Sequence, residues 1–86
     1  MSVRDQDVHI RGASAYAIGA LGDVGGISTL SLALTDPMPW VRRNAAWSLL
    51  ELGEELHLVA SMDQDSDVGV RSFAAKAQER LDLEEG

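Results

Sequence analysis

The stretch that decides the fold reads DPMPWVRRNAAWSLLELGE and covers residues 36–54. Two other stretches match it position by position, namely DQDVHIRGASAYAIGALGD at residues 5–23 and DSDVGVRSFAAKAQERLDL at residues 65–83. The copies begin 31 and 29 residues apart, and each has an aspartate at its start and a Val-Arg or Ile-Arg pair five residues later. Self-similarity at this spacing is typical of proteins built from a repeated structural unit.

Each copy predicts a long helix. In the middle copy, apolar and small residues recur with the period of a helix and fall on one face, at Val41, Ala45, Ser48, Leu49 and Leu52. Asp36 and Pro37 suit a helix cap and a first turn, and Gly53 suits a left-handed stop. A shorter helical run follows each of the first two copies. We therefore expect long helices at about residues 7–21, 38–52 and 67–81, and shorter ones at about 26–34 and 55–62.

These helices predict an all-α fold. A chain of 86 residues is one small domain, and a helix pair of this size buries its apolar face only against neighbouring pairs. The expected architecture is a single domain over residues 1–86, a short α-solenoid of about five helices, or two and a half helix pairs. The third copy has polar residues where the second has apolar ones, as a C-terminal capping unit requires, at Lys76, Gln78 and Glu79.

The pattern D-P-x-x-W-V-R-x-x-A-A-x-x-L-x-x-L-G of residues 36–53 resembles the HEAT repeat. More narrowly, it is similar to the short HEAT-like repeats named after phycobilisome lyases. The resemblance covers about residues 5–81. It implies that the second helix of each pair lines a concave binding surface. The lyase-type relatives help to attach bilin pigments to phycobiliproteins, which makes an accessory subunit of an enzyme complex the alternative function.

The recurring arginines Arg11, Arg42 and Arg71 have two interpretations. They form a row of anion-binding cations, or each binds turn carbonyls or an aspartate of a neighbouring unit. An arginine that recurs together with an aspartate in every unit favours the second interpretation.

The four aromatic residues predict a binding surface. On a helical wheel of about 100° per residue, Tyr16, Trp40, Trp47 and Phe73 lie opposite the apolar core stripe. Trp, Tyr and Arg dominate the energetics of protein interfaces. We therefore predict that a protein or peptide binds an aromatic strip made of Tyr16, Trp40, Arg43, Asn44, Trp47, Glu51, Phe73, Lys76 and Arg80, with His9 beside it. The alternative is that the two tryptophans fill grooves between repeats.

The first long helix predicts a second contact. No short helical run precedes it in this sequence, and it contains no Lys, Gln or Glu between Val8 and Leu21. Unprotected solenoid ends tend to associate. We expect a homodimer, or docking on a larger repeat protein, through Ile10, Ala17, Ile18 and Leu21.

Charge and composition disfavour other functions. The net charge of −7 opposes nucleic-acid binding. There is no Cys, the two His have no metal-ligand spacing, and the run from Asp63 to Asp67 lacks the glycine and glutamate of a calcium loop. We expect an acidic cytoplasmic protein that is not an enzyme and has no catalytic residue, metal or cofactor, and no membrane contact.

Overall fold

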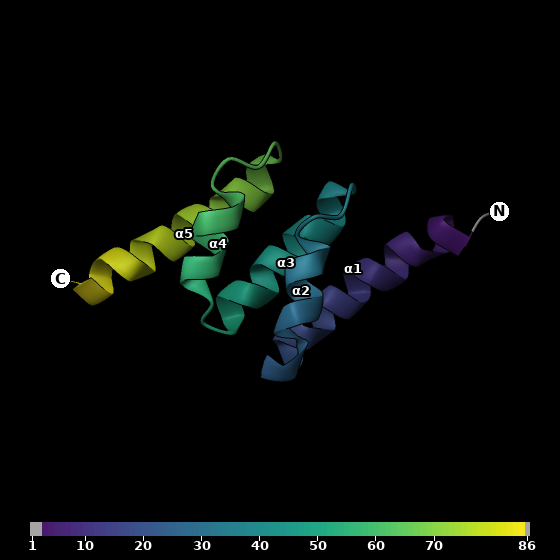
Figure 1. Cartoon of the computed structure of the whole chain (residues 1–86), viewed down its shortest axis with the longest axis horizontal. Coiled ribbons are helices and arrows are strands. Elements are labelled where there is room, and N and C mark those ends of the chain that lie inside the picture. Colours follow the sequence, from purple (N-terminus) through teal and green to yellow (C-terminus); the bar gives the residue numbers. More distant parts are fainter. Residues whose placement is uncertain (1–2, 86) are drawn as a thin grey trace.

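Three long helices lie side by side, and two shorter helices cover one face of them (Figure 1). The computed structural model describes the backbone of residues 3–85 and the side chains of residues 8–84. The long helices are α1 (Val3–Leu21), α3 (Pro39–Glu51) and α5 (Val68–Glu85), and the short ones are α2 (Ile27–Ala33) and α4 (Glu55–Met62). Residues 3–85 contain no strand. The prediction of an all-α solenoid of five helices is confirmed.

Glycine residues determine where α1 and α3 end. Gly22 and Gly53 have φ values of 67° and 78°, which only glycine adopts readily. The Gly53 N–H donates to the Leu50 carbonyl, and the Glu54 N–H donates to the Leu49 carbonyl. This arrangement satisfies carbonyl groups that the last turn of a helix leaves open, so the chain reverses within a few residues.

The helix starts differ in part from the predicted ones. Helix α3 begins at Pro39, and Met38 occupies the position before it, so the prediction of Asp36 as the cap is wrong. Asp36 instead accepts one hydrogen bond from the Met38 N–H and two from the Arg11 guanidinium. Asp67 does cap α5, because its carboxylate accepts from the Val70 N–H at 3.0 Å. Helix α5 continues to Glu85, so the acidic residues at the end of the sequence, from Asp82 to Glu85, belong to a helix.

The first repeat spacing is two residues longer than the second, and the two extra residues lie in the turn between α1 and α2. A short 3₁₀ helix, η1 (Val24–Gly26), separates α1 from α2 and is held by a hydrogen bond from the Gly25 N–H to the Asp23 carboxylate. Helices α3 and α4 are joined by a shorter turn that contains no such segment. The longer turn therefore accounts for the difference in the spacing of the units.

The core lies between the long-helix layer and the short helices. Its fully buried large side chains come from four helices: Leu30, Val41, Leu49, Leu58 and Val70. Helix α2 packs more extensively on α3 than on α1, and α4 packs more on α5 than on α3. Within residues 3–85, the structural pairs are therefore α2–α3 and α4–α5, and α1 is the long helix outside these two pairs. The Cα trace measures 52 × 27 × 15 Å.

Candidate protein-binding surface

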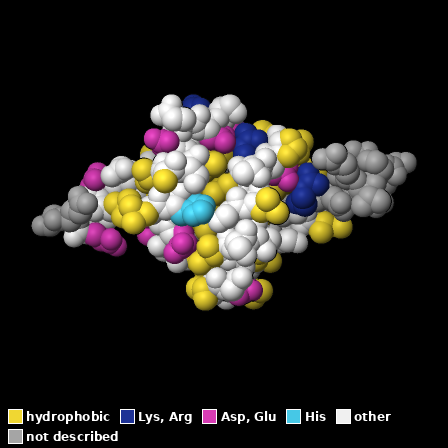
Figure 2. Space-filling model, in the orientation of Figure 1, with side chains coloured by type: hydrophobic (Ala, Val, Ile, Leu, Met, Phe, Trp, Pro, Cys, Tyr) yellow, Lys and Arg dark blue, Asp and Glu magenta, His cyan; other side chains and the backbone are white. Residues whose placement is uncertain are grey.

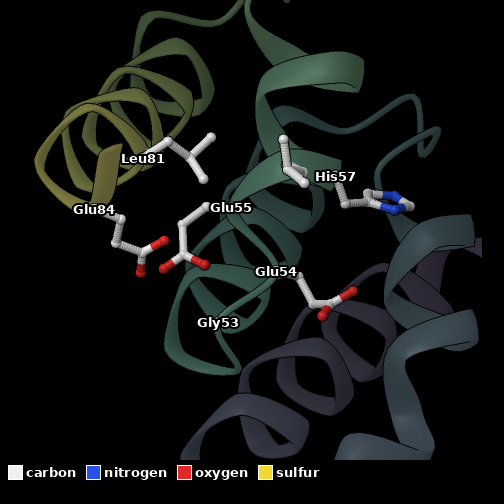
Figure 3. A pocket seen from close by; sticks show the side chains of 7 residues that line it. Gly53, Glu54, Glu55, His57, Leu81 and Glu84 are labelled. Carbon is white, nitrogen blue, oxygen red and sulfur yellow. The ribbon is translucent and has the colours of Figure 1, made fainter. Parts of the chain in front are cut away.

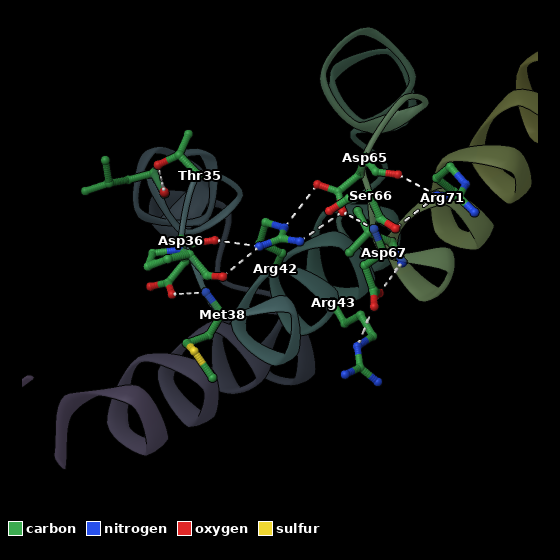
Figure 4. Close-up of polar contacts among 12 residues, drawn as sticks. Thr35, Asp36, Met38, Arg42, Arg43, Asp65, Ser66, Asp67 and Arg71 are labelled. Atoms are coloured by element: carbon green, nitrogen blue, oxygen red, sulfur yellow. Dashed lines mark hydrogen bonds and ion pairs between the residues drawn. The ribbon is translucent and has the colours of Figure 1, made fainter. Parts of the chain in front are cut away.

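Of the recurring arginines, Arg42 joins two units and Arg71 holds the turn before its own helix (Figure 4). Arg42 donates to both carboxylate oxygens of Asp65, at 3.0 and 3.2 Å, and to the carbonyls of Asp36 and Pro37. Arg71 donates to the carbonyls of Asp65 and Ser66. Arg42 thereby connects the turn before its own helix with the turn of the next unit. The second interpretation of the recurring arginines is correct.

Arg11 repeats this contact one unit earlier and fixes the charge of Asp36. Burial alone would raise the pKa of Asp36, but the hydrogen bonds from Arg11 and Met38 and the positive charges of Arg11 and Arg42 outweigh it and lower that pKa below its ordinary value. Asp36 is therefore an ionised acceptor in the folded protein. These arginines bind the protein itself and do not form a row of free cations.

The aromatic strip runs along the side of α3 that is opposite its buried residues. Trp40, Asn44, Trp47 and Glu51 follow one another at helical spacing, and none of them is buried. Val41, Ala45, Ser48 and Leu49, which face the other way, are fully buried. The predicted separation between core face and outer face therefore holds in α3.

The centre of the strip is a stacked aromatic pair. The rings of Tyr16 in α1 and Trp47 in α3 lie 4.8 Å apart between centroids, with 14° between their planes. Tyr16 remains 51 % exposed, and Trp47 is half-buried. The pair bridges two long helices and still presents aromatic surface to solvent.

A second aromatic pair lies toward the start of the same two helices. The rings of His9 and Trp40 meet edge to face at 5.7 Å, and Trp40 is 39 % exposed. Trp40 packs over Gly12, where a Cβ atom would come within 2.1 Å of its ring. Sequence reasoning did not predict the role of Gly12. The signal available for it is that a glycine in the middle of a helix needs a packing reason.

The remaining strip residues are less uniform than predicted. Phe73 is half-buried and packs against the core, so it offers less surface than the wheel suggests. Arg43 lies 3.4 Å from the Asp67 carboxylate, and Arg80 lies 3.7 Å from the Glu55 carboxylate. Among the strip cations, Lys76 pairs with no carboxylate of the described residues. The charges of the strip without a salt-bridge partner among the described residues are therefore those of Lys76 and Glu51.

The opposite face carries α2 and α4 and mixes hydrophobic, acidic and other side chains (Figure 2). Here the His57 Nε2 atom lies 3.3 Å from the Ser31 hydroxyl and links the two short helices. A hollow of about 320 Å³ near the end of α5 is lined by Glu54, Glu55 and Glu84 (Figure 3). No group of metal-ligating side chains occurs among the described residues. Within residues 3–85, no helix combines the length and apolar character needed to cross a bilayer.

The predicted self-association residues lie on α1, and three of them, Ile10, Ala17 and Leu21, share one face. Ile10 and Leu21 are exposed, and Ala17 is half-buried. Ile18 instead packs against the core and Gly26, so it belongs to the interior side of the helix.

The comparison with known families agrees with this architecture. A family model described as HEAT repeats matches residues 2–79, which includes α3, α4 and most of α5. The chain belongs to the HEAT repeat family. HEAT repeats generally mediate protein–protein interactions and are typically non-enzymatic scaffolds. No curated protein and no solved structure gives a significant match to this HEAT repeat protein.

Proposed function

We propose that this HEAT repeat protein is a non-catalytic adaptor that binds a protein or peptide on the aromatic strip. The observation that carries the proposal is the stack of Tyr16 on Trp47, which bridges α1 and α3 and leaves the tyrosine half exposed. Exposed aromatic surface on a small protein is typical of a contact site. Two helices hold the rings in place, so a partner does not have to order them on binding.

The surroundings of the stack indicate the partner's chemistry. The two aromatic pairs offer ring faces and edges, which suit aromatic side chains. Lys76 adds a positive charge without a carboxylate partner among the described residues. We infer a partner segment that combines aromatic and acidic side chains, met in the cytoplasm.

The two tryptophans allow a direct test, because each aromatic pair contains one of them. The partner is first isolated by affinity capture with the full chain and then titrated against ¹⁵N-labelled protein. We expect both indole N–H signals to shift on binding. Trp47→Ala and Tyr16→Ala should each weaken binding about 30-fold or more, as expected for interface residues worth about 2 kcal/mol.

A matched control distinguishes binding at the aromatic strip from nonspecific hydrophobic binding. Leu56 is an exposed apolar residue on α4, so Leu56→Ala should leave the affinity unchanged. Circular dichroism must show that the Tyr16 and Trp47 variants keep their helicity. Indole signals that do not move, or equal binding by the wild type and the Trp47→Ala variant, would reject the proposal.

The same capture tests the other functions that the sequence raised. A phycobiliprotein as the captured partner would favour the lyase-type accessory subunit. Binding to DNA or RNA that weakens steeply with salt would favour nucleic-acid recognition, which the net charge of −7 opposes. Nothing in the described residues favours either of them over the adaptor.

A further inference from the structure

One face of α1 is open where the matching faces of the other long helices are buried. Ile10 occupies the repeat position of Val41 and Val70, both of which have no exposed surface, yet Ile10 is 61 % exposed. One turn later the same holds for the exposed Ser14, whose counterparts Ala45 and Ala74 are buried. The repeat itself therefore identifies this face as one that normally packs against another helix.

The open face comprises Ile10, Ser14, Ala17 and Leu21. With about 100° per residue, these four residues fall within an arc of about 60° on the helix. Tyr16 lies about 130° away from their centre on the same wheel, so the open face and the aromatic strip are separate surfaces. An occupant of one face leaves the other accessible.

The open face is uncharged although the protein is strongly acidic. Between Val8 and Leu21 the only charged residue is Arg11, and it pairs with Asp36. A second copy of a protein with a net charge of −7 meets repulsion at most other surfaces. On the open face, the second copy meets no charge repulsion from this part of α1.

The four residues are self-complementary in an antiparallel pair. Ile10 and Leu21 are equally far from the midpoint between Ala15 and Tyr16, and so are Ser14 and Ala17. When two copies of α1 cross at this point in opposite directions, Ile10 of each copy meets Leu21 of the other. The small residues at the centre allow the helix axes to approach to about 8 Å.

The other end of the solenoid does not offer a comparable surface. Positions on α5 that match the buried Leu49 and Leu50 of α3 carry Gln78 and Glu79, and both are exposed. Stacking α1 of one copy on α5 of another would bury these polar groups without partners, which is costly. A symmetric contact through α1 alone avoids that cost and closes after two copies.

We propose that the protein forms a two-fold symmetric dimer in which the open faces of two antiparallel α1 helices pack together. The dimer places two aromatic strips on one particle, which would bind a partner with two recognition segments. The dimer contact does not depend on the adaptor function, because the two surfaces share no residue.

The dimer is tested by sedimentation velocity of the full chain. The protein concentration is varied from about 1 µM to about 1 mM, because this range covers the Kd values of weak and moderate complexes. We expect the mass to rise with concentration to twice the chain's 9.2 kDa. Ile10→Glu should return it to the monomer at every concentration. Leu56→Glu places the same charge on an exposed apolar residue of α4, which is 73 % exposed, and should leave the dimer intact.

The direction of the helices is tested by charge pairs at the centre of the face. In the antiparallel dimer position 14 meets position 17 of the other copy. Ser14→Glu combined with Ala17→Lys should therefore dimerise, whereas Ser14→Glu combined with Ala17→Glu should stay monomeric. Because Ser14 is exposed and Ala17 half-buried, circular dichroism should show that both double variants fold.

Three results would overturn the proposal. They are a wild-type monomer up to the highest concentration, a dimer that survives Ile10→Glu, and equal behaviour of the two double variants. Equal partner capture by the wild type and the Trp47→Ala variant would reject the adaptor proposal without changing the sedimentation result, so failure of the adaptor proposal and failure of the dimer are distinguishable.

Discussion

Among single residues, Arg42 connects groups from two units of the solenoid. Its guanidinium satisfies two turn carbonyls and both oxygens of Asp65, and the side chains of Arg42 and Asp65 are about equally buried, with 11 % and 10 % exposed. Buried ion pairs of this kind owe their importance to the penalty of breaking them, because the remaining charge is left without a partner.

Arg42→Ala should therefore lower the free energy of unfolding by about 3–5 kcal/mol, because Asp65 and the two carbonyls would lose their donors together. Arg43→Ala is the matched control, since Arg43 also pairs with an aspartate but is exposed, and it should cost about 0–1 kcal/mol. Urea denaturation followed by circular dichroism measures both. Equal losses in the two variants would contradict the role given to Arg42.

Asp36 makes the folded state sensitive to acid. Its pKa is lower in the folded protein than the ordinary value of 3.8 that applies to the unfolded chain. The stability that ionised Asp36 contributes is therefore complete above that ordinary value and is lost as the pH falls through the folded pKa. We expect the urea midpoint to fall between about pH 5 and pH 2, with a smaller fall in Asp36→Asn. Arg11→Ala should reduce the fall as well, and an unchanged profile in both variants would contradict this.

Among the described elements, the crossing of α1 and α3 is the most extensive helix contact. Ser48 donates a hydrogen bond to the Ala15 carbonyl, and a Cβ atom at position 19 would lie 2.5 Å from the Ser48 Cα atom. Gly19 therefore sets the distance between the two helices that carry the aromatic pairs. The site depends on this contact because the Tyr16–Trp47 stack bridges the same two helices.

Gly19→Ala should destabilise the protein by about 1–3 kcal/mol, although alanine normally stabilises a helix by about 1 kcal/mol relative to glycine. The sign changes because the new methyl group meets backbone atoms that cannot move aside. Gly69→Ala provides the comparison, since the Cβ atom there would meet only side-chain atoms, the Arg43 Cδ at 2.5 Å and the Asp67 carboxylate at 2.9 Å, which move aside more easily than backbone. Thermal unfolding should show the larger loss of Tm for the Gly19 variant.

The elements also show how far the sequence predicts this structure. The positions of Gly22 and Gly53 predict the helix ends, and the recurrence of arginine with aspartate predicts the contacts between units, because both signals are local and repeated. The start of α3 at Pro39 and the contact of Trp40 with Gly12 were not predicted. They depend on which of two prolines begins the helix and on the register of α1 against α3, and neither is encoded in the period of one helix.

For the whole molecule, the linear arrangement of units predicts an uneven stability. Helix α3 packs against all four other helices, whereas α1 packs on α3 and α2 at one end of the molecule (Figure 1). In such arrays, stability is the sum of the units and of the contacts between neighbours. The central helix should therefore open only when the whole chain unfolds, and a terminal helix should open on its own.

Native-state hydrogen exchange should give α3 the highest protection, α5 an intermediate value and the exposed part of α1 the lowest when the protein is dilute. The order follows from how well each helix is covered, since α3 packs on all four other helices, α4 packs more extensively on α5 than α2 does on α1, and Ile10 and Ser14 of α1 are exposed. Raising the concentration through the range in which the dimer forms should increase protection in residues 10–21 and leave α5 unchanged. Ile10→Glu should abolish that increase while it preserves the order at low concentration, and α1 protection equal to that of α3 in the dilute protein would contradict the linear arrangement.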